Sequence, residues 1–469
     1  MNPRLTLALL AGRAVSWLTR RLQRGGGTVL PGHVIPRIDP CAVATIAAEL
    51  PGGTVLVSGT NGKTTTTRMI AQIITQAGLV PIHNRSGANL MTGIASSIAA
   101  HTDLRGHPRG DVGVFEADEA HVPMAAEALQ PRVLALTNVF RDQLDRYGEV
   151  ELIAQTWRKA IRSLQPNATL ILNADDPIIA QLGEDAPCSV IYFGLEDQTV
   201  GSATVPHEAD KRLCHRCGAR IRYTWSYYGH VGHYACPSCG WRRPDRQVRM
   251  TAVRAERDER LHLTIAAQEH GLELELPLAG LYNAYNALAA TTVCRTLGIA
   301  DEHIAAGLAR FAAVFGRQEK VAVGQGRLLL NLVKNPVGFN QVLQTTFGSG
   351  VGTRNSELGT LLVIAINDLF ADGTDISWLW DVDFEMLADH PPTILCTGLR
   401  AHDMALRLKY AEIEDDQVTV EPSIEAAVGR ALDAATVGGS VIVCPTYTAM
   451  LDIRARLQQR GAVAPFWED

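Results

Sequence analysis

Long hydrophobic runs and an excess of positive charge are both missing from this sequence of 469 residues. No apolar stretch reaches the roughly 20 residues that a membrane-spanning helix needs. The 43 Lys and Arg residues are outnumbered by 49 Asp and Glu residues, and the net charge of −6 argues against a general nucleic-acid-binding surface. Internal repeats and low-complexity tracts are absent as well. With 46% hydrophobic residues, the chain is expected to be a globular protein of two or three domains.

Cysteine is too scattered for a disulfide framework. Five of the nine cysteines are spread singly along the chain, mostly within apolar patterns, which suits a reducing cytoplasm. The other four form two CxxC pairs separated by 18 residues, a spacing typical of a zinc ribbon in which four thiolates surround one metal ion. We therefore predict a structural Zn²⁺ site, with a redox dithiol as the alternative, formed by Cys214, Cys217, Cys236 and Cys239.

The N-terminal stretch Leu5–Leu10 is apolar and is followed by Arg13, Trp17 and the basic pair Arg20–Arg21, with no small-residue cleavage site behind it. This pattern predicts a short basic amphipathic helix. Packing of this helix against the body of the protein is the favoured interpretation, and peripheral contact with a membrane surface is the alternative. The expected location is the cytoplasm, at the inner face of the membrane if the alternative holds.

A Gly-rich loop follows the first clear strand pattern. The β-branched run Thr54–Ser58 leads into Gly-Thr-Asn-Gly, and Lys-Thr-Thr then opens a helical pattern. Backbone N–H groups of such a loop bind phosphates, the lysine adds a cation, and the next hydroxyl offers a ligand to Mg²⁺. The loop is shorter than a full Walker motif because Val57 occupies the place of its first glycine. The predicted nucleotide-binding residues, of which Thr64 is also a Mg²⁺ ligand, are Gly59, Thr60, Asn61, Gly62, Lys63, Thr64 and Thr65.

Strand and helix patterns alternate along most of the chain. Apolar runs at residues 112–115, 133–137, 169–173 and 189–193 predict a doubly wound parallel sheet of the α/β class. Runs at residues 328–332, 361–366, 393–396 and 440–444 predict a second, Rossmann-like α/β domain. The expected domains are an N-terminal helical leader at 1–50, an ATP-binding domain at 51–310 with the zinc ribbon inserted at 205–250, and a C-terminal α/β domain at 315–469.

Acidic side chains follow the strand at residues 112–115. Ligands of parallel α/β sheets bind beyond the carboxyl ends of the strands, so Glu116 is expected beside the Gly-rich loop. A carboxylate there can hold the Mg²⁺ that bridges two phosphates. Glu116 is therefore predicted as a catalytic residue and Mg²⁺ ligand, and Asp118 and Glu119 are weaker candidates.

Five motifs, in the same order along the chain, resemble those of the Mur ligase superfamily, the ATP-dependent amide-forming ligases of peptidoglycan synthesis and their folylpolyglutamate synthase relatives. They lie at residues 59–65, 138–145, 172–177, 280–290 and 316–319. The resemblance implies that ATP converts a carboxylate to an acyl phosphate, which an amine then displaces. It also implies that Asn173, Asp175 and Asn283 shape the nucleotide pocket, and that Arg317 reaches the nucleotide from the domain junction.

The C-terminal half narrows the resemblance to the MurT family, the ligase subunits of lipid II isoglutaminyl synthases. The MurT resemblance rests on the zinc ribbon and on an aspartate-rich segment with two tryptophans, Asn367–Glu385. The resemblance implies a heterodimer with a glutaminase of the GatD type, amidation of the D-glutamate α-carboxylate of the lipid II stem peptide, and no nucleic-acid partner. It also implies that Asp375 completes the partner's Cys-His pair, with Asp372 and Asp381 as the other candidates.

The sequence departs from the superfamily pattern at several positions. Gln143 stands where a histidine is common, and Asn331 and Lys334 replace an acid and a histidine before Asn335-Pro336. Between residues 151 and 319 the only lysines are Lys159 and Lys211, so no lysine is assigned the carbamylated role known in the superfamily. A second Mg²⁺ site is therefore left unassigned.

Two absences indicate a split enzyme. No nucleotide-sugar domain precedes Gly59, so the substrate is not expected to be UDP-linked. Neither Cys396 nor Cys444 lies in a Gly-x-Cys-x-Gly elbow, so the glutaminase is expected on another chain. The alternatives are a self-sufficient Mur-type or folylpolyglutamate-type amino acid ligase, and a zinc-ribbon NTPase that depends on nucleic acid.

Overall fold

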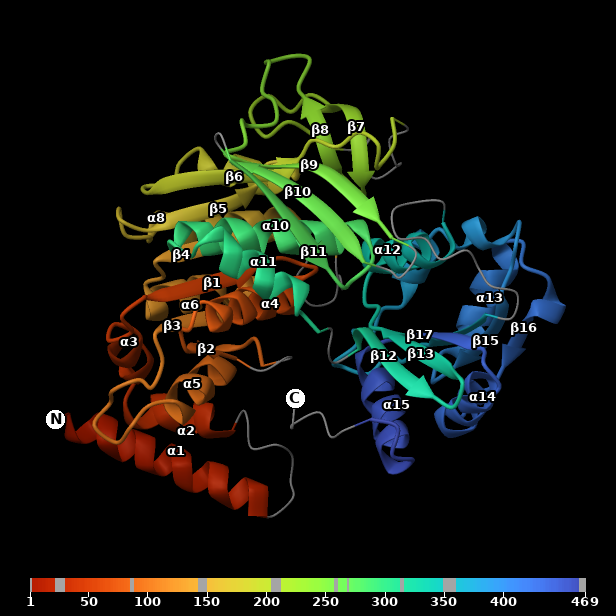
Figure 1. Ribbon diagram of the computed structural model, residues 1–469, viewed down its shortest axis with the longest axis horizontal. Helices are drawn as coiled ribbons and strands as arrows, with labels where there is room; N and C mark the ends of the chain where they lie inside the picture. Colours follow the sequence, from red (N-terminus) through yellow and green to blue (C-terminus); the bar gives the residue numbers. More distant parts are fainter. Residues whose placement is uncertain are drawn as a thin grey trace.

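The computed structural model describes residues 2–21, 30–84, 88–141, 150–203, 212–256, 260–267, 270–312, 316–348 and 360–463. Within these ranges the chain forms a nine-stranded sheet, a six-stranded sheet and a separate two-stranded hairpin (Figure 1). The expectations for Gln143 and Lys211 concern residues outside the described ranges. The domain boundaries expected above stay predictions.

The nine-stranded sheet has the order β11-β10-β9-β6-β5-β4-β1-β3-β2. Its parallel part confirms the α/β fold expected from the apolar runs, and its strands at residues 54–58, 112–116, 133–136 and 169–173 are buried along nearly their whole length. The strands are β1 (Thr54–Ser58), β2 (Pro81–His83), β3 (Val112–Glu116), β4 (Val133–Leu136), β5 (Thr169–Asn173) and β6 (Ser189–Leu195).

Three further strands extend this sheet beyond β6. They are β9 (Val248–Ala255), β10 (Leu261–Ala267) and β11 (His270–Leu276), and the last two pairings are antiparallel. Of the three, only β11 is expected from the sequence alone, as a strand at residues 272–276 that follows the zinc ribbon. The alternation of buried Leu261, Leu263 and Ile265 with more exposed residues shows that β10 has one face on the core and one face outward, a pattern of half-buried strands.

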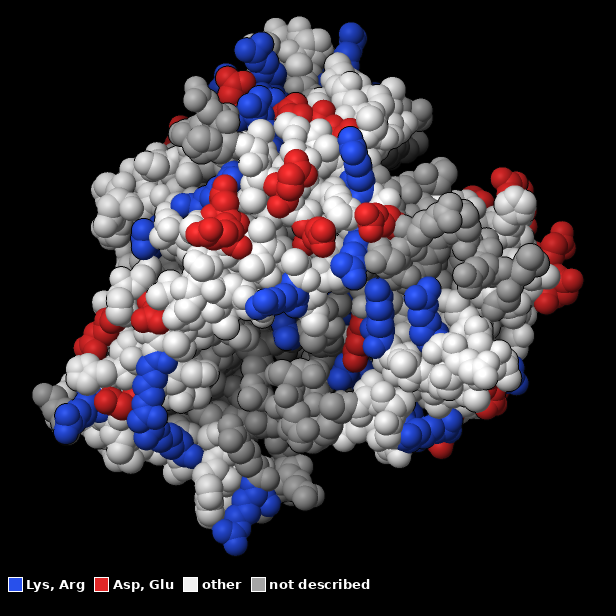
Figure 2. All heavy atoms as spheres, in the orientation of Figure 1, with Lys and Arg blue, Asp and Glu red and all other residues white. Residues whose placement is uncertain are grey.

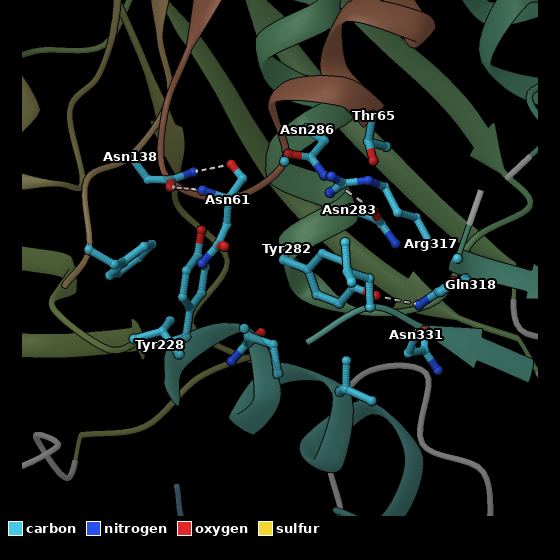
Figure 3. A pocket seen from close by; sticks show the side chains of 18 residues that line it. Asn61, Thr65, Asn138, Tyr228, Tyr282, Asn283, Asn286, Arg317, Gln318 and Asn331 are labelled. Atoms are coloured by element: carbon cyan, nitrogen blue, oxygen red, sulfur yellow. Dashed lines mark hydrogen bonds between the residues drawn. The ribbon is translucent and has the colours of Figure 1, made fainter. Parts of the chain in front are cut away.

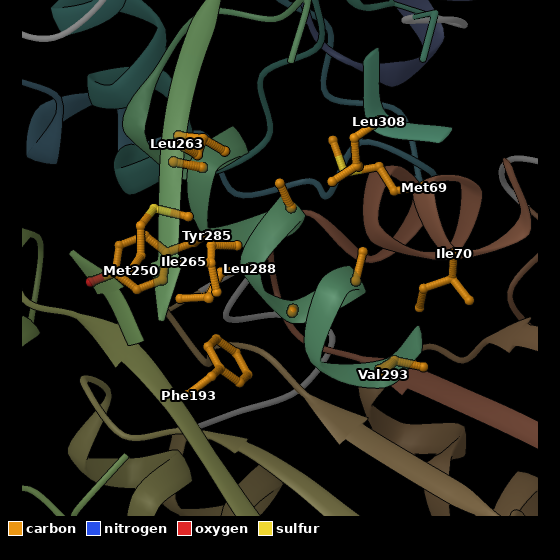
Figure 4. Close-up of a cluster of buried hydrophobic side chains, with 14 of the residues drawn as sticks. Met69, Ile70, Phe193, Met250, Leu263, Ile265, Tyr285, Leu288, Val293 and Leu308 are labelled. Atoms are coloured by element: carbon orange, nitrogen blue, oxygen red, sulfur yellow. The ribbon is translucent and has the colours of Figure 1, made fainter. Parts of the chain in front are cut away.

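Helices cover both faces of the nine-stranded sheet (Figure 1). One face packs against α4 (Lys63–Gln76), α10 (Leu281–Thr296) and α11 (Asp301–Ala309), with the side chains of Figure 4 between them. The other face is covered by α3 (Ala42–Ala47), α5 (Met91–Ala100), α6 (Val122–Leu129) and α8 (Val150–Arg162), and α1 (Pro3–Arg21) and α2 (Leu30–Ile38) extend this core by packing against α5. In β1, Val55 and Val57 join the first core and Leu56 joins the second, as the two-residue period of a strand requires.

The six-stranded sheet has the order β12-β13-β17-β14-β15-β16, and only β12 is antiparallel to its neighbour. Its strands are β12 (Arg317–Val323), β13 (Gly326–Asn331), β14 (Leu361–Ala365), β15 (Thr393–Thr397), β16 (Val418–Val420) and β17 (Ser440–Pro445). Its cores include residues of α12 (Pro336–Phe347) and α13 (Ala401–Tyr410) on one face, and of α14 (Ile424–Thr436) and α15 (Tyr447–Gln459) on the other. Strands β13, β14, β15 and β17 match the runs predicted for the second α/β unit, whereas β12 and β16 were not predicted.

Two peripheral features remain. The hairpin of β7 (Arg222–Tyr228) and β8 (Val231–Ala235) stands at the top of Figure 1, and short helical turns lie at α9 (Pro177–Ala180), Glu119–His121, Gln181–Gly183, Ser377–Asp381, Phe384–Leu387 and Asp415–Gln417. Helix α1 runs along the lower edge, where Leu5 and Leu9 are buried. Within the described part of the chain, no helix combines the length and apolarity needed to cross a bilayer.

Candidate functional site

The Gly-rich loop connects strand β1 to helix α4 through a turn that needs glycine. Gly62, the residue before α4, has a φ of 83°, and a Cβ atom on Gly59 would collide with the Thr137 hydroxyl. Because α4 begins at Lys63, the free N–H groups of its first turn lie at the end of this loop. The local geometry is therefore that of an anion-binding helix N-terminus.

A second loop, which follows β4, holds the Gly-rich loop in place. The side chain of Asn138 accepts a hydrogen bond from the Asn61 N–H and donates one to the Asn61 carbonyl, each at 2.9 Å. The N–H of Phe140 donates to the Thr60 hydroxyl at 3.0 Å. These bonds fix the loop conformation, as expected for a preorganised phosphate site.

Two buried carboxylates lie beside the loop. Glu119 forms an ion pair with the Lys63 ammonium at 2.9 Å, and Lys63 also donates to the Gly59 carbonyl at 2.6 Å. Burial raises the pKa of Glu116, although a hydrogen bond from Thr64 and the charges of Arg317 and Lys63 oppose the shift. Among the described residues, neither Glu116 Oε2 nor Glu119 Oε1 has a hydrogen-bond partner. Buried oxygens of this kind fit a hard cation such as Mg²⁺, with Glu116 and Thr64 as the ligands that this chain offers.

A cavity lined by polar and aromatic side chains opens next to the Gly-rich loop, as ligand sites commonly do (Figure 3). Its walls come from the loop, helix α10, the start of β12 and helix α12. Five of the predicted nucleotide-binding residues line it, namely Asn61, Gly62, Thr65, Asn283 and Arg317. The site is therefore shared between the elements of both large sheets.

Arg317 is the cation of this cavity. It opens β12, and its guanidinium forms no hydrogen bond or ion pair at contact distance with any other residue that the structure describes. Burial lowers its pKa, while the charge of Glu116 raises it. A partly buried guanidinium without a close partner favours an anionic ligand such as phosphate.

Asn173 and Asp175 do not line the cavity. The Asn173 amide donates to the Thr137 carbonyl at 3.0 Å, so it joins neighbouring strands. The Asp175 carboxylate accepts hydrogen bonds from Arg243 at 2.6 Å and from the Tyr285 hydroxyl at 2.6 Å. Both side chains are fully buried and engaged, and Asp175 anchors the segment that carries the CxxC pairs.

Several cavity residues were not assigned to the site from the sequence. Asn138 and Asn286 lie inside the recognised motifs, so their motif positions were an available signal. Tyr228 comes from the ribbon hairpin, and its sequence offers no signal of a role in the cavity. The unassigned residues with side chains labelled in Figure 3 are Asn138, Tyr228, Tyr282, Asn286, Gln318 and Asn331.

The four predicted metal ligands meet at one point. Their sulfur atoms all lie within 4.8 Å of one another, with 3.6 Å between Cys214 and Cys239 and 3.5 Å between Cys217 and Cys236. These distances far exceed a disulfide bond of about 2.05 Å and approach the ~3.8 Å edge of a tetrahedron around Zn²⁺. The N–H groups of Cys239 and Ser238 lower the pKa of Cys236 to about 6, which favours its thiolate. The cluster fits a structural Zn²⁺.

The three candidate aspartates of the C-terminal segment differ in accessibility. Asp372 is buried and accepts hydrogen bonds from the Thr448 N–H and hydroxyl at 2.7 and 2.5 Å. Asp375 is partly exposed and accepts a hydrogen bond from the Ser377 N–H. Asp381 is exposed and lies 3.5 Å from Arg141. Only Asp375 and Asp381 are therefore accessible to another protein.

Comparison with known protein families assigns the two halves of the chain. Residues 57–234 match the Mur ligase middle domain, and residues 332–450 match the MurT ligase C-terminal domain. The chain is 34% identical over 466 residues to the lipid II isoglutaminyl synthase (glutamine-hydrolyzing) subunit MurT of Streptococcus pneumoniae, covering 99% of both chains. It is 32% identical to the MurT subunit of Staphylococcus aureus, covering 97% of both.

Solved structures show the same fold. A pseudomurein peptide ligase type C from Methanothermus fervidus has a TM-score of 0.64 and 23% identity, with 87% of this chain and 78% of that one covered. MurF ligase from Thermotoga maritima in complex with ADP has a TM-score of 0.61 and 15% identity, with 90% and 84% covered. The chain belongs to the MurT family of ATP-dependent ligases, within the Mur ligase superfamily.

Proposed function

We propose that this chain activates the D-glutamate α-carboxylate of the lipid II stem peptide as an acyl phosphate and amidates it to D-isoglutamine. The ammonia comes from a partner glutaminase of the GatD type. The observation that carries the proposal is the full-length likeness to subunits named as parts of a glutamine-hydrolyzing lipid II isoglutaminyl synthase. The cavity between the Gly-rich loop and Arg317 supports the proposal, because the loop N–H groups and the guanidinium can bind the negatively charged phosphates of a nucleoside triphosphate.

Each residue of the site has a separate task in this reaction. The Gly-rich loop and the first turn of α4 bind the phosphates of ATP. When ATP binds, the Lys63 ammonium leaves its ion pair with Glu119 and contacts a phosphate oxygen instead. Glu116 and Thr64 would hold Mg²⁺, and the ion would supply positive charge that neutralises the phosphates. Arg317 binds phosphate from the opposite wall. The position of the cavity between the two sheets would limit the access of water to the acyl phosphate.

The partner is proposed to dock beside Asp375. Large apolar side chains are exposed on the adjoining turns and on helix α13, with Phe370 83% exposed and Tyr410 66% exposed. Leu369, Trp380, Leu399 and Leu406 are also exposed on these elements. Apolar exposure next to an accessible carboxylate suits a protein interface in which Asp375 orients a histidine of the glutaminase.

Helix α1 is proposed to touch the cytoplasmic face of the membrane that carries the lipid-linked substrate. Leu7, Leu10, Trp17 and Leu18 are 47–60% exposed on its outer side. The first 38 residues contain six arginines and no Asp or Glu. Figure 2 shows Lys and Arg side chains at the edge where Figure 1 places α1. An apolar face flanked by arginines matches an anionic bilayer surface.

The test is the dependence of ATP turnover on lipid II, glutamine and a co-expressed glutaminase. We expect amidation with glutamine only when the partner is present, and amidation with free ammonia in its absence. Full activity with a free amino acid and no second protein would instead indicate a self-sufficient ligase. Stimulation by RNA or DNA alone would indicate a nucleic-acid-dependent NTPase. A zinc analysis of the same preparation, with about one ion expected per chain, tests the ribbon.

A further inference from the structure

The ribbon hairpin reaches the nucleotide cavity. Its tip is the turn Tyr228-Gly229-His230 between β7 and β8, and Tyr228 lines the same cavity as Asn61 and Arg317. A Cβ atom on Gly229 would lie 3.2 Å from the Phe140 ring and 3.6 Å from Val337. The tip is therefore inserted between the loop that braces the Gly-rich loop and helix α12.

The tip is fixed by buried contacts rather than by the hairpin alone. The His230 ring is buried, packs 4.8 Å from the Phe140 ring, and lies 3.3 Å from the Asp176 carboxylate. Asp176 also accepts a hydrogen bond from the Val139 N–H at 2.9 Å. One carboxylate thus holds the hairpin tip and the loop 138–140 at the same time.

The cysteine cluster supports the base of the same hairpin. Cys214 and Cys236 pack in one small core with Tyr223, Tyr234 and Trp241. The Tyr223 hydroxyl then donates to the His230 carbonyl at 2.9 Å. Because this core is small, the base of the hairpin would depend on a metal ion bound by the four cysteines, whereas Tyr227, Tyr228 and Val231 near the tip belong to the main core.

The walls of the cavity differ in chemistry. Figure 3 shows Tyr228 beside Asn61 and Asn138, whereas Arg317, Gln318 and Asn331 lie across the cavity. The Tyr228 ring packs 5.9 Å from Phe140 and edge-on to Tyr285 at 5.5 Å, so its orientation is fixed. Loop N–H groups and Arg317 suit phosphates, and the aromatic, amide-lined wall suits a flat purine base.

We propose that the zinc ribbon is part of the nucleotide site, with Tyr228 forming the wall against which the base of the nucleotide lies. The cysteines, with zinc bound, hold that wall in place. Loss of zinc should therefore weaken the affinity of the protein for the base of the nucleotide and leave its affinity for the phosphates unchanged. This inference rests on the proposed ATP site and deepens it. Tyr228 is a binding residue here, and Asp176 and His230 are its positioning residues.

The experiment compares two probes on the full-length chain with Mg²⁺, using calorimetry or competition. One probe is a non-hydrolysable ATP analogue, and the other is inorganic tripolyphosphate, which lacks the base. Tyr228→Leu should weaken binding of the analogue about tenfold and leave tripolyphosphate unchanged, since base stacking on an aromatic ring accounts for a loss of this size. Tyr228→Phe retains the ring and should bind both probes as the wild type does. Thr224→Ala, an exposed position of the same strand, is the matched control.

Metal removal gives the second arm. The Cys239→Ser variant should lose zinc and bind the ATP analogue about tenfold more weakly, again with unchanged tripolyphosphate binding. Equal loss of both probes, or no loss of the analogue in either variant, would overturn the inference. If the wild type binds neither probe, the proposed ATP site fails first. Circular dichroism and proteolysis confirm that each variant is folded before binding is compared.

Discussion

The side-chain amides of Asn61 and Asn335 exchange two hydrogen bonds, at 3.3 and 3.0 Å, across the junction between the two large sheets. Asn61 lies in the Gly-rich loop, and Asn335 caps helix α12 by accepting a hydrogen bond from the Gly338 N–H at 2.8 Å. The phosphate loop is therefore tied directly to the helix that forms the opposite wall of the cavity. This pair couples the relative position of the two sheets to the nucleotide site.

Asn335→Ser tests that coupling. Serine retains the helix cap but cannot donate an amide hydrogen bond to Asn61. Unfolding free energy should fall by about 1–3 kcal/mol, because both hydrogen bonds to Asn61 are lost and each usually contributes about 0.5–1.5 kcal/mol. ATP-dependent amidation should fall more steeply, by at least tenfold in kcat/KM, because the two cavity walls lose their alignment. Asn340→Ser, at an outward position of the same helix that bonds Asp383, should leave kcat/KM near the wild-type value.

Glu116→Gln tests the metal site through pH. Burial raises the pKa of the Glu116 carboxyl, so in the metal-free protein it holds its proton to higher pH than in the unfolded chain. The protonated carboxyl contributes to the free energy of unfolding at pH values below its pKa in the unfolded chain, near 4.5. This contribution is lost as the pH rises through the higher pKa of the folded protein. Mg²⁺ binds only the ionised form, so Mg²⁺ affinity should rise with pH over the same interval.

Mg²⁺ titrations of ATP hydrolysis at several pH values measure this effect. The wild type should need less Mg²⁺ as pH rises, and Glu116→Gln should lose at least 100-fold in turnover and show no such trend. Glu127→Gln, an exposed change on α6, should behave as the wild type. A pH-independent Mg²⁺ requirement in the wild type would contradict the assignment of Glu116.

The part of the site that could be predicted is the part whose position depends only on residues nearby in the sequence. The Gly-rich loop and Glu116 follow strands whose apolar runs are visible in the sequence, and the order of strand, loop and helix determines their surroundings. Asp175 also follows a strand, but its partners Arg243 and Tyr285 lie 68 and 110 residues away. A carboxylate beside a nucleotide and one that anchors an insertion have the same local sequence pattern, so only tertiary contacts separate them.

The fold shows a similar division. Strands β3, β4 and β5 were predictable because parallel strands buried on both faces are continuously apolar. Strand β9 carries exposed arginines at 249 and 254 within a half-buried pattern, and it follows directly on the basic ribbon segment. Its membership of the main sheet depends on pairing with β6 and β10, which composition does not reveal. Of the antiparallel extension, only β11 was therefore predicted, and β9 and β10 were missed.

Cys214→Ser should remove zinc and loosen the ribbon. Metal analysis of the wild type should give about one zinc per chain, and the variant should give none, because three thiolates leave the tetrahedron open. Limited trypsin digestion should then cut at the exposed Arg220 and Arg222 faster than in the wild type. Cys41→Ser replaces an exposed cysteine outside the cluster and should retain the metal. Zinc retention in Cys214→Ser would contradict the four-cysteine site.

Asp375→Asn should separate the two halves of the reaction. We expect loss of glutamine-dependent amidation with the ammonia-dependent reaction preserved, because the change affects only the partner's histidine. Loss of both reactions would place Asp375 in the ligase site instead. Asp381→Asn breaks the exposed contact with Arg141 and should have a small effect on either reaction. Asp372→Asn should instead lower the melting temperature, because Asp372 is buried against Thr448.

Helix α1 gives the last prediction. Trp17 and Leu18 are only about half exposed, so burying the rest of each side chain in a bilayer interface should contribute about 1 kcal/mol, and each arginine near an anionic surface about 1 kcal/mol. The chain should therefore float with vesicles containing phosphatidylglycerol, bind weakly to phosphatidylcholine alone, and dissociate as salt is added. Trp17→Glu should reduce flotation at least tenfold, whereas Val437→Glu, at another highly exposed apolar position, should not.

Trp17→Glu should also slow amidation of lipid II in vesicles while leaving ATP binding unchanged, since α1 lies outside the cavity. Unchanged flotation of Trp17→Glu, or association of the wild type with itself instead of with vesicles, would assign this face to a protein contact.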